Sequence, residues 1–132
     1  MRTVNKVILI GNVTKDPFIK NTENGKKVAL FSLATNRYYK TMEWEEKSES
    51  EFHSCVAWWN LAERTEKFLT KWKLIYVEWR MKTRITEKDD GTKNYKTEVI
   101  LSHLIFLNKK SDFETQEDIE ADKIIEEEYD KF

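Results

Sequence analysis

Residues 60–71 read NLAERTEKFLTK and carry the clearest helical periodicity in the body of this chain. Asn60 is of a type that often caps a helix N-terminus, and Glu63 stands at the third helical position, where the two can form a capping box. Apolar or small side chains recur at helical spacing at Leu61, Thr65, Phe68 and Leu69. The pattern predicts an amphipathic helix over residues 61–71.

Strand patterns flank this helix on both sides. The predicted strands, rich in β-branched and aromatic residues, cover residues 4–13, 26–39, 51–58, 74–86 and 95–107. Asn24-Gly25 and Asp89-Asp90-Gly91 predict tight turns, because Asn, Asp and Gly tolerate positive φ. We expect residues 14–25 to form a turn segment and the polar residues 40–50 to form a loop.

The order of these elements indicates the fold class. Five strands with a single helix between the third and the fourth are typical of an all-β OB-fold, a five-stranded Greek-key barrel that commonly binds oligonucleotides or oligosaccharides. The fold alone does not define the function.

Charge divides the chain into two parts. Residues 111–132 hold ten acidic and two basic residues, a net charge of −8, whereas residues 1–110 hold 21 basic and 14 acidic residues, a net charge of +7. We expect an OB-fold domain over residues 1–110 and an acidic, disordered C-terminal tail over residues 111–132. A basic body suits a polyanionic partner, although a solubilising tail on a mildly basic domain explains the same charges.

Several classes of protein are disfavoured by composition. Cys55 is the single cysteine, and with only His53 and His103 as imidazoles the chain lacks zinc-ligand spacing, so we expect neither a metal nor a cofactor. His53 lacks the neighbouring groups of an activated nucleophile, so we expect no enzyme. No apolar run approaches the roughly 20 residues of a membrane span, and no secretory signal precedes the first strand, so we expect a cytoplasmic location.

A specific resemblance rests on blocks of sequence in the same order and spacing. The chain resembles the bacterial single-stranded-DNA-binding proteins. The matching blocks are Asn5–Asn12, Asp16-Pro17, Asn24-Gly25, Phe31–Thr35, His53, Val56, Asn60–Glu63, Tyr76–Glu78, Lys82–Arg84 and Tyr95–Val99. The resemblance implies sequence-independent binding of single-stranded DNA during replication, recombination and repair. It also implies a homotetramer, with Asn5 and His53 at the contact between subunits, and an association with the nucleoid.

The family's base-stacking positions fall on Tyr39, Phe52 and Trp58, which are all aromatic here. A fourth position, usually tryptophan, falls on Thr86, so this platform is missing. The basic positions along the family's DNA path imply phosphate contacts by Lys6, Lys20, Lys40, Lys71, Lys82 and Arg84. The plainer interpretation is that such rings belong to a core and that each lysine is a solvated surface charge.

The tail bears on partner recruitment. In the family, an acidic tail ending in phenylalanine recruits replication and repair enzymes, and Glu128, Asp130 and Phe132 agree with that pattern, whereas Lys131 departs from it and proline is absent. The tail could instead act as an electrostatic brush. An alternative to the whole assignment is an OB-fold accessory module of the primosome or of replication restart, with weak binding to single strands.

Four of the five tryptophans stand at positions that are glycine in the family: Trp44, Trp59, Trp72 and Trp79. One hypothesis is adaptation, in which extra indoles enlarge the stacking surface. The other is that UGA codons, which some bacteria read as glycine, are represented as tryptophan. Under the second hypothesis only Trp58 is a genuine tryptophan.

Overall fold

The structure, a computed structural model, describes residues 2–107. Its elements in chain order are β1 (Val7–Val13), β2 (Phe18–Asn21), β3 (Lys27–Lys40), β4 (Glu46–Trp58), α1 (Asn60–Phe68), β5 (Leu74–Glu87) and β6 (Lys93–Phe106). No helix within residues 2–107 is both long and apolar enough to cross a membrane.

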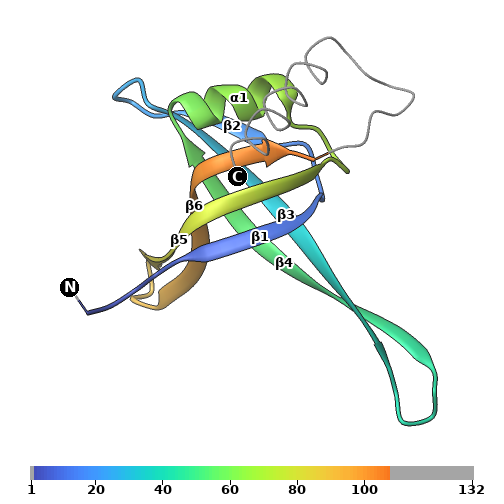
Figure 1. Cartoon of the computed structure of the whole chain (residues 1–132). Helices are drawn as coiled ribbons and strands as arrows, with labels where there is room; N and C mark the ends of the chain where they lie inside the picture. The colour runs from blue at the N-terminus through green and yellow to red at the C-terminus, as the bar shows by residue number, and fades with distance from the viewer. Residues whose placement is uncertain (1, 108–132) are drawn as a thin grey trace.

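The strands form one sheet that closes on itself (Figure 1). The strand order is β1-β5-β6-β4-β3-β2, and β1 pairs in addition with β3, which joins the two sides of the sheet into a barrel. All neighbours are antiparallel except β4 and β6, which run parallel at Cys55 and Val99. Five strands make the barrel, β2 is added at the edge of β3, and α1 connects β4 to β5. The predicted OB-fold is therefore confirmed.

Barrel closure depends on the second half of β1. Asn12 and Val13 pair with Ala34 and Leu33 of β3, while the preceding residues of β1 pair with β5. A Cβ atom at position 11 would lie 2.2 Å from the backbone carbonyl oxygen of Ala34, closer than real Cβ atoms come to other atoms. Only glycine lets the two backbones come together here.

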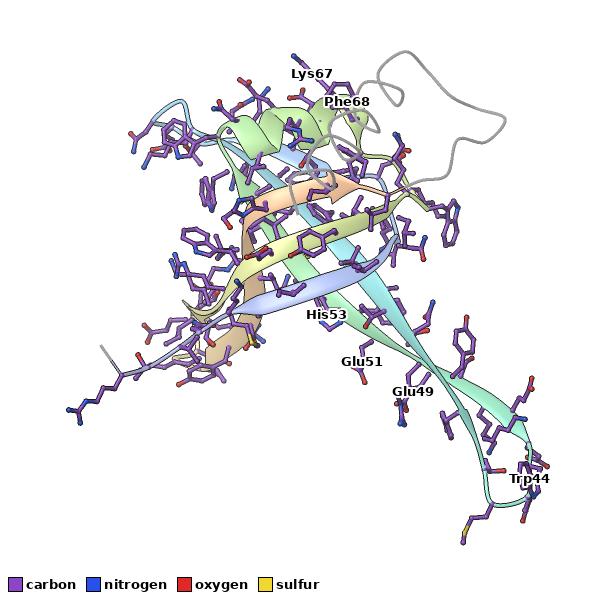
Figure 2. All side chains as sticks on the ribbon, viewed as in Figure 1. Trp44, Glu49, Glu51, His53, Lys67 and Phe68 are labelled. Carbon is purple, nitrogen blue, oxygen red and sulfur yellow. The ribbon has the colours of Figure 1, made fainter. Side chains whose placement is uncertain are left out.

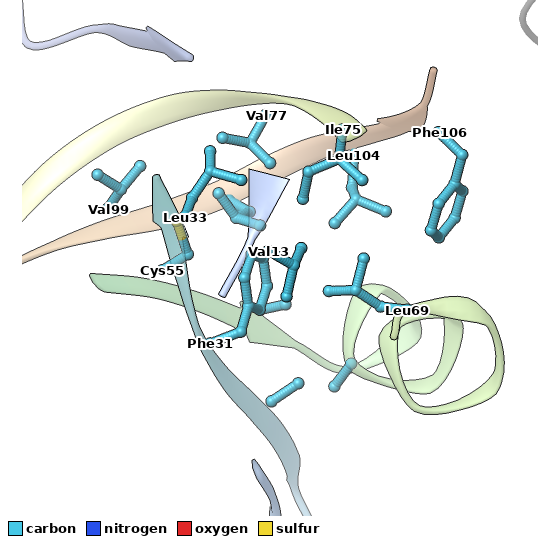
Figure 3. Packing of buried hydrophobic residues seen from close by; sticks show 14 residues of the cluster. Val13, Phe31, Leu33, Cys55, Leu69, Ile75, Val77, Val99, Leu104 and Phe106 are labelled. Atoms are coloured by element: carbon cyan, nitrogen blue, oxygen red, sulfur yellow. The ribbon is translucent and has the colours of Figure 1, made fainter. Parts of the chain in front are cut away.

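The core fills the barrel and extends beneath α1 (Figure 3). Leu33, Ile75 and Leu104 are fully buried inside the barrel. At the helix, the ring of Phe68 meets the ring of Phe106 edge to face, with centroids 6.2 Å apart. Cys55 is also buried, and this burial raises the pKa of its thiol to about 12. The thiol therefore acts as a small apolar core group.

Two connections differ from the sequence-based expectation. Within the expected turn segment, Phe18–Asn21 forms β2 and pairs with the start of β3. Most of the expected loop over residues 40–50 is strand, because β3 and β4 continue past the barrel as a two-stranded arm, visible at the lower right of Figure 1. Polar cross-strand pairs hold the arm: Arg37 bonds Glu49 at 2.6 Å, and Ser50 donates to Asn36 at 2.6 Å. The sequence of this hairpin lacks the alternation of apolar and polar residues that predicts a strand, because neither side of the arm packs against the core.

The helix is shorter than predicted: it covers Asn60–Phe68, whereas the sequence predicts residues 61–71, and it begins one residue earlier. Its N-cap is Trp59, no side chain caps it, and the predicted capping box is wrong. The amide of Trp59 donates to the carbonyl of Lys27 in β3, which ties the chain to the barrel at that residue and places Asn60 inside the helix. Leu69 turns to extended backbone and is buried, which ends the helix before Lys71.

Positive φ occurs at five of the described residues, and each is either glycine or tryptophan. These residues are Gly25, Gly91, Trp44, Trp59 and Trp72. For a residue with a Cβ atom, left-handed backbone costs roughly 1–2 kcal/mol.

We predict that Gly11→Ala destabilises the fold strongly, because the added Cβ meets backbone that cannot move without opening the barrel. The expected loss in the free energy of unfolding is about 3 kcal/mol. The matched control is Gly25→Ala, where nothing surrounds the new Cβ and only the positive φ opposes it, for a loss of about 1 kcal/mol. Urea denaturation measures both, and equal losses would contradict the closure argument.

Candidate nucleic-acid interface

Strand register places aromatic side chains of β2 and β4 and basic side chains of β2 and β5 on one outer face of the barrel. Residues paired across adjacent strands point to the same side of a sheet. On β4, Trp58 pairs with Val28, which itself pairs with Lys20 of β2. On the other side, Val56 pairs with Ile100, and Ile100 pairs with Arg80 of β5. We call this surface the outer face. Its exposed members are Phe18, Lys20, Phe52, Trp58, Lys82 and Arg84, and Arg80 is half-buried on it.

A small apolar cluster forms the floor of the outer face. Val28, Val56 and Ile100 pack together, with Leu30 partly buried against them, and this cluster is separate from the barrel core. It joins β3, β4 and β6 from the outside. The face is consequently rigid beneath its exposed rings and cations.

Two of the three predicted stacking residues share the outer face. Phe52 is 66% exposed and Trp58 is 37% exposed, and they lie six residues apart on β4, a separation of about 20 Å along the strand. Neither ring is part of the barrel core. Both rings are therefore accessible from solvent on one surface.

The third predicted stacking residue, Tyr39, lies on the arm. It pairs with Lys47 and so points to the opposite side of the β3–β4 ribbon from Phe52. Its ring is 36% exposed and lies under the guanidinium of Arg37 at 4.9 Å. The side chains of residues 38–40 and 46–48 line a surface pocket at this level of the arm. Tyr39 thus belongs to a second surface, on the opposite side of the ribbon from the outer face, because successive side chains of a strand point to opposite sides.

The predicted cations are distributed over several surfaces. Lys20, Lys82 and Arg84 are on the outer face. Lys6 forms an ion pair of 2.9 Å with Glu78 beside β1. Lys40 lies over the ring of Trp44 in the arm at 5.8 Å, and Lys71 lies over the ring of Trp72 at 4.7 Å in the connection from α1 to β5. Lys6 and Lys71 are therefore not on the outer face. Lys40 pairs with Glu46 and lies beyond the barrel, on the side of the arm that continues this face.

One acidic group moderates the charge of this surface. Glu98 of β6 is buried and forms an ion pair of 3.1 Å with Arg84. Arg84 remains largely exposed, so it both neutralises the carboxylate and presents charge to solvent. At the far end of the same strand pair Thr86 stands opposite Asn94, so the position where the family usually has tryptophan offers no ring.

Sequence reasoning missed three members of this neighbourhood, two exposed aromatic rings and one half-buried arginine. Phe18 lies on β2 opposite Leu30, and Tyr38 shares the side of the arm that continues the outer face. Arg80 was also missed, although Arg80, Lys82 and Arg84 recur at every second residue. That period of two was a readable signal for a basic strand face.

The two residues predicted at a subunit contact have partners within the chain. The side-chain amide of Asn5 donates to the carbonyl of Met81 at 2.8 Å and accepts from its amide at 3.0 Å, which extends the pairing of β1 with β5. His53, labelled in Figure 2, is half-buried and its Nε2 lies 2.9 Å from the hydroxyl of Thr35. Within residues 2–107 no cluster of His, Cys, Asp or Glu is suited to a metal.

A separate apolar surface lies along β1. Ile8 and Ile10 are more than half exposed, at 55% and 54%, and they pair with Glu78 and Tyr76 of β5. The hydroxyl of Tyr76 donates to Glu78 at 2.7 Å, and this bond, followed by the one from Lys6, lowers the pKa of the Glu78 carboxyl. We call Ile8, Ile10, Tyr76 and Glu78 the β1 face.

The closed barrel, with one helix connecting β4 to β5, defines an OB-fold protein, and its outer face carries aromatic and basic side chains. The chain belongs to the single-strand binding protein family, which it matches over residues 4–107. This family consists of DNA-binding proteins without enzymatic activity, so the expectation of a non-enzyme is confirmed by membership.

Several relatives can be compared directly. The chain is 40% identical over 107 residues to single-stranded DNA-binding protein 3 of Listeria innocua, covering 81% of this chain and 66% of that protein. It is 40% identical over 108 residues to a single-stranded DNA-binding protein of Bacillus cereus, covering 82% and 62%. The chain thus spans somewhat less than two thirds of the length of these relatives.

A solved structure gives the same comparison in three dimensions. The Plasmodium falciparum SSB in complex with single-stranded DNA aligns with a TM-score of 0.74 and 37% sequence identity. The alignment covers 82% of this chain and 98% of that one. The predicted tail, including Glu128, Asp130 and Phe132, lies outside the residues that the structure describes.

We predict that Arg84→Ala lowers stability as well as charge, because it leaves the buried carboxylate of Glu98 without its ion pair. The expected loss is about 1–3 kcal/mol in the free energy of unfolding. Lys20→Ala removes the same charge from the outer face at an exposed site and is expected to change stability by less than about 0.5 kcal/mol. Chemical denaturation of both variants at neutral pH tests the difference.

Proposed function

We propose that the chain binds single-stranded DNA without sequence preference, on the outer face. The observation that carries the proposal is the presence of Phe52 and Trp58 on the same surface as a row of cations on β5. Single strands expose bases that stack on aromatic rings, and they carry a phosphate charge at every nucleotide. A surface with both features, on a rigid apolar floor, matches both needs.

Lack of sequence preference follows from the chemistry of the face. Every base has a π-face, so a ring accepts any of them, and a stacked base typically contributes about 1–3 kcal/mol. Lysine and arginine contact phosphates, which carry no sequence information directly. The family membership and the DNA complex of the Plasmodium relative support the same proposal.

The arm extends the proposed surface. Tyr38 continues the outer face, and Tyr39 with Lys40 lines the pocket on the arm. A DNA strand that leaves the outer face along β4 meets Tyr38 next, since β3 and β4 run without interruption from barrel to arm. Tyr39 lies on the other side of the arm, so the DNA reaches it by wrapping around the arm. We infer that Tyr39 and Lys40 contact nucleotides beyond those on the barrel.

We predict that Phe52→Ala and Trp58→Ala each weaken binding of oligo-dT by about 5- to 150-fold, the equivalent of one lost stacking contact. The matched control is Tyr95→Ala, which removes an exposed ring from the opposite side of the β5–β6 ribbon and is expected to leave affinity unchanged. Fluorescence anisotropy of a labelled oligonucleotide measures all three.

The same titration repeated at rising salt distinguishes the proposal from its alternative. Lys82→Ala is expected to flatten the dependence of log affinity on log salt by about 0.7, the contribution of one phosphate contact to a single strand. Absence of binding and of any salt dependence in the parent chain would contradict the proposal and favour an accessory interaction module.

We also infer that the chain self-associates through the β1 face and forms a homotetramer. Two exposed isoleucines side by side on a strand form an apolar surface that water disfavours. The exposed edge of this face carries the Lys6–Glu78 ion pair, which is suited to the polar rim of an interface. Asn5 supports it indirectly, because its bonds to Met81 hold the start of β1 in the sheet.

Self-association has a direct test. Ile10→Asp places a charge on the β1 face and is expected to yield dimers or monomers in light scattering after size-exclusion chromatography. Ile85→Asp, at another exposed isoleucine near the β5–β6 turn, is the control and is expected to leave the mass unchanged. A tetramer that persists in the Ile10 variant would contradict this assignment of the interface.

For the acidic segment we propose recruitment of replication and repair proteins, with Glu128, Asp130 and Phe132 as contacts. The support is its charge of −8 beside a body of +7, together with an aromatic side chain that an apolar pocket can accept. Binding to single strands at sites of replication, recombination and repair would place the protein at the nucleoid in the cytoplasm. Deletion of Phe132 is expected to abolish capture of such enzymes and to preserve oligo-dT affinity; undiminished capture would refute the recruitment.

A further inference from the structure

Three hairpin turns of this chain share one hydrogen-bond pattern. In the turn at residues 22–26, the amide of Gly25 donates to the carbonyl of Thr22, and the amide of Thr22 donates to the carbonyl of Lys26. The turn at residues 88–92 repeats both bonds, with Gly91 in the place of Gly25. Such three-residue loops need left-handed backbone at this position, which is why glycine is favoured there.

The third turn, at the tip of the arm, has tryptophan in that place. The amide of Trp44 donates to the carbonyl of Thr41 at 2.9 Å, and the amide of Thr41 donates to the carbonyl of Glu45 at 3.0 Å. The φ of Trp44 is 63°, against 76° and 84° at Gly25 and Gly91. Figure 2 shows the Trp44 side chain at the end of the arm, away from the barrel. The turn has the geometry of a glycine turn without its glycine.

Trp72 occupies a second glycine position. The amide of Lys73 donates to the carbonyl of Thr70 at 3.3 Å, which closes a four-residue turn with Trp72 third. Its φ is 76°. Positive φ at the third residue defines a type II turn, where glycine or asparagine is the ordinary occupant.

Trp59 occupies the least suitable backbone of the three. Its φ is 55° and its ψ is −122°, which is the mirror image of the extended conformation rather than the left-handed helical one. One tertiary and one helical bond hold it there: its amide donates to the carbonyl of Lys27 in β3, and its carbonyl accepts the first bond of α1, from Glu63. Glycine reaches this region freely, whereas a residue with a Cβ atom does not.

The fourth residue, Trp79, has ordinary φ but lies at the register shift between Glu78 and Trp79, where β5 is irregular against β6. Glycine within a strand commonly marks such a bulge. Composition agrees with all four positions. The chain has three glycines in 132 residues, where about nine are ordinary, and five tryptophans.

We propose that positions 44, 59, 72 and 79 are glycine in the protein as its own cells make it, through UGA codons read as glycine. A single reassigned codon explains why tryptophan stands at all four positions, of which three have backbone that favours glycine and the fourth lies at a bulge. The proposal is independent of the proposed function, because it rests on backbone geometry, strand register and composition. It assigns Trp58 as the one tryptophan, and hence the one indole available to DNA.

The competing explanation treats the four indoles as extra stacking platforms. Each does have a cation near its ring: Lys40, Lys26, Lys71 and Arg80 lie 4.7–5.8 Å from the ring centroids of Trp44, Trp59, Trp72 and Trp79. None of the four, however, belongs to the outer face that carries Phe52 and Trp58. Trp44 and Trp72 lie in turns, Trp59 lies just before the helix and Trp79 lies at the bulge in β5. These separate positions do not form a continuous path for a DNA strand.

Two measurements on the native gene and protein decide the proposal. Sequencing is expected to find UGA at codons 44, 59, 72 and 79 and UGG at codon 58. Peptide mass spectrometry of protein isolated from the source cells is expected to find the mass of glycine at the four positions and of tryptophan at 58. UGG at the four codons, or tryptophan masses in the native peptides, would overturn it.

A third experiment uses recombinant protein and tests the physical reason. The triple variant Trp44→Gly, Trp59→Gly, Trp72→Gly is expected to unfold about 10 °C higher than the parent chain, because three residues leave unfavourable backbone. Trp58→Gly is the matched control, with an expected decrease. A triple variant with an unchanged or lower midpoint would overturn the backbone argument.

The same variants separate the two explanations of the indoles. With Trp79→Gly added, the quadruple variant is expected to bind oligo-dT with parental affinity, whereas extra stacking platforms would require a loss of about 5-fold or more per ring. If neither chain binds DNA, the proposed function fails while the thermal and sequencing results still test the glycine assignment.

Discussion

The contact of β1 with β3 at Gly11 is the constraint on which the rest of the structure depends. Without it the six strands are an open sheet with β1 and β2 at its edges. With it, β1 is bonded to β5 along most of its length and to β3 at its end, so the sheet curves into a barrel and one side becomes interior. The close approach needs a residue without a side chain at position 11.

Closure also creates the outer face. Once one side of every strand faces the core, alternation sends the intervening residues outward. Phe52 and Trp58 on β4 then lie on the same surface as Arg80 and Lys82 on β5, although the two strands are separated in sequence by a helix. The small cluster of Val28, Val56 and Ile100 packs beneath that surface. The outer face and the barrel core are thus two consequences of one register.

Backbone conformation divides the aromatic residues into two groups. Trp58 lies in regular strand and is a member of the outer face, whereas Trp44, Trp59 and Trp72 have the positive φ that the chain otherwise reserves, among its described residues, for Gly25 and Gly91. A gain from exposed cation–π contacts, typically about 0.5–1 kcal/mol, does not exceed the roughly 1–2 kcal/mol cost of left-handed backbone. Exposure of an indole is therefore poor evidence for a binding role unless its backbone is also favourable.

The sequence by itself determined the order of the five barrel strands and the helix, the fold class, and the identity of Phe52, Trp58 and Lys82 as surface groups. Strand alternation and helical spacing depend on residues that are close together in the sequence, so they can be recognised locally. The family was recognised from several short blocks of sequence in the same order and spacing. Only the tertiary structure decided that Tyr39 faces away from Phe52, that Arg80 joins the basic row, and that polar residues 40–50 form an arm. Those features depend on cross-strand register, which the local pattern of one strand does not encode. The helix cap was misjudged for the same reason, since a bond from Trp59 to β3 set its position.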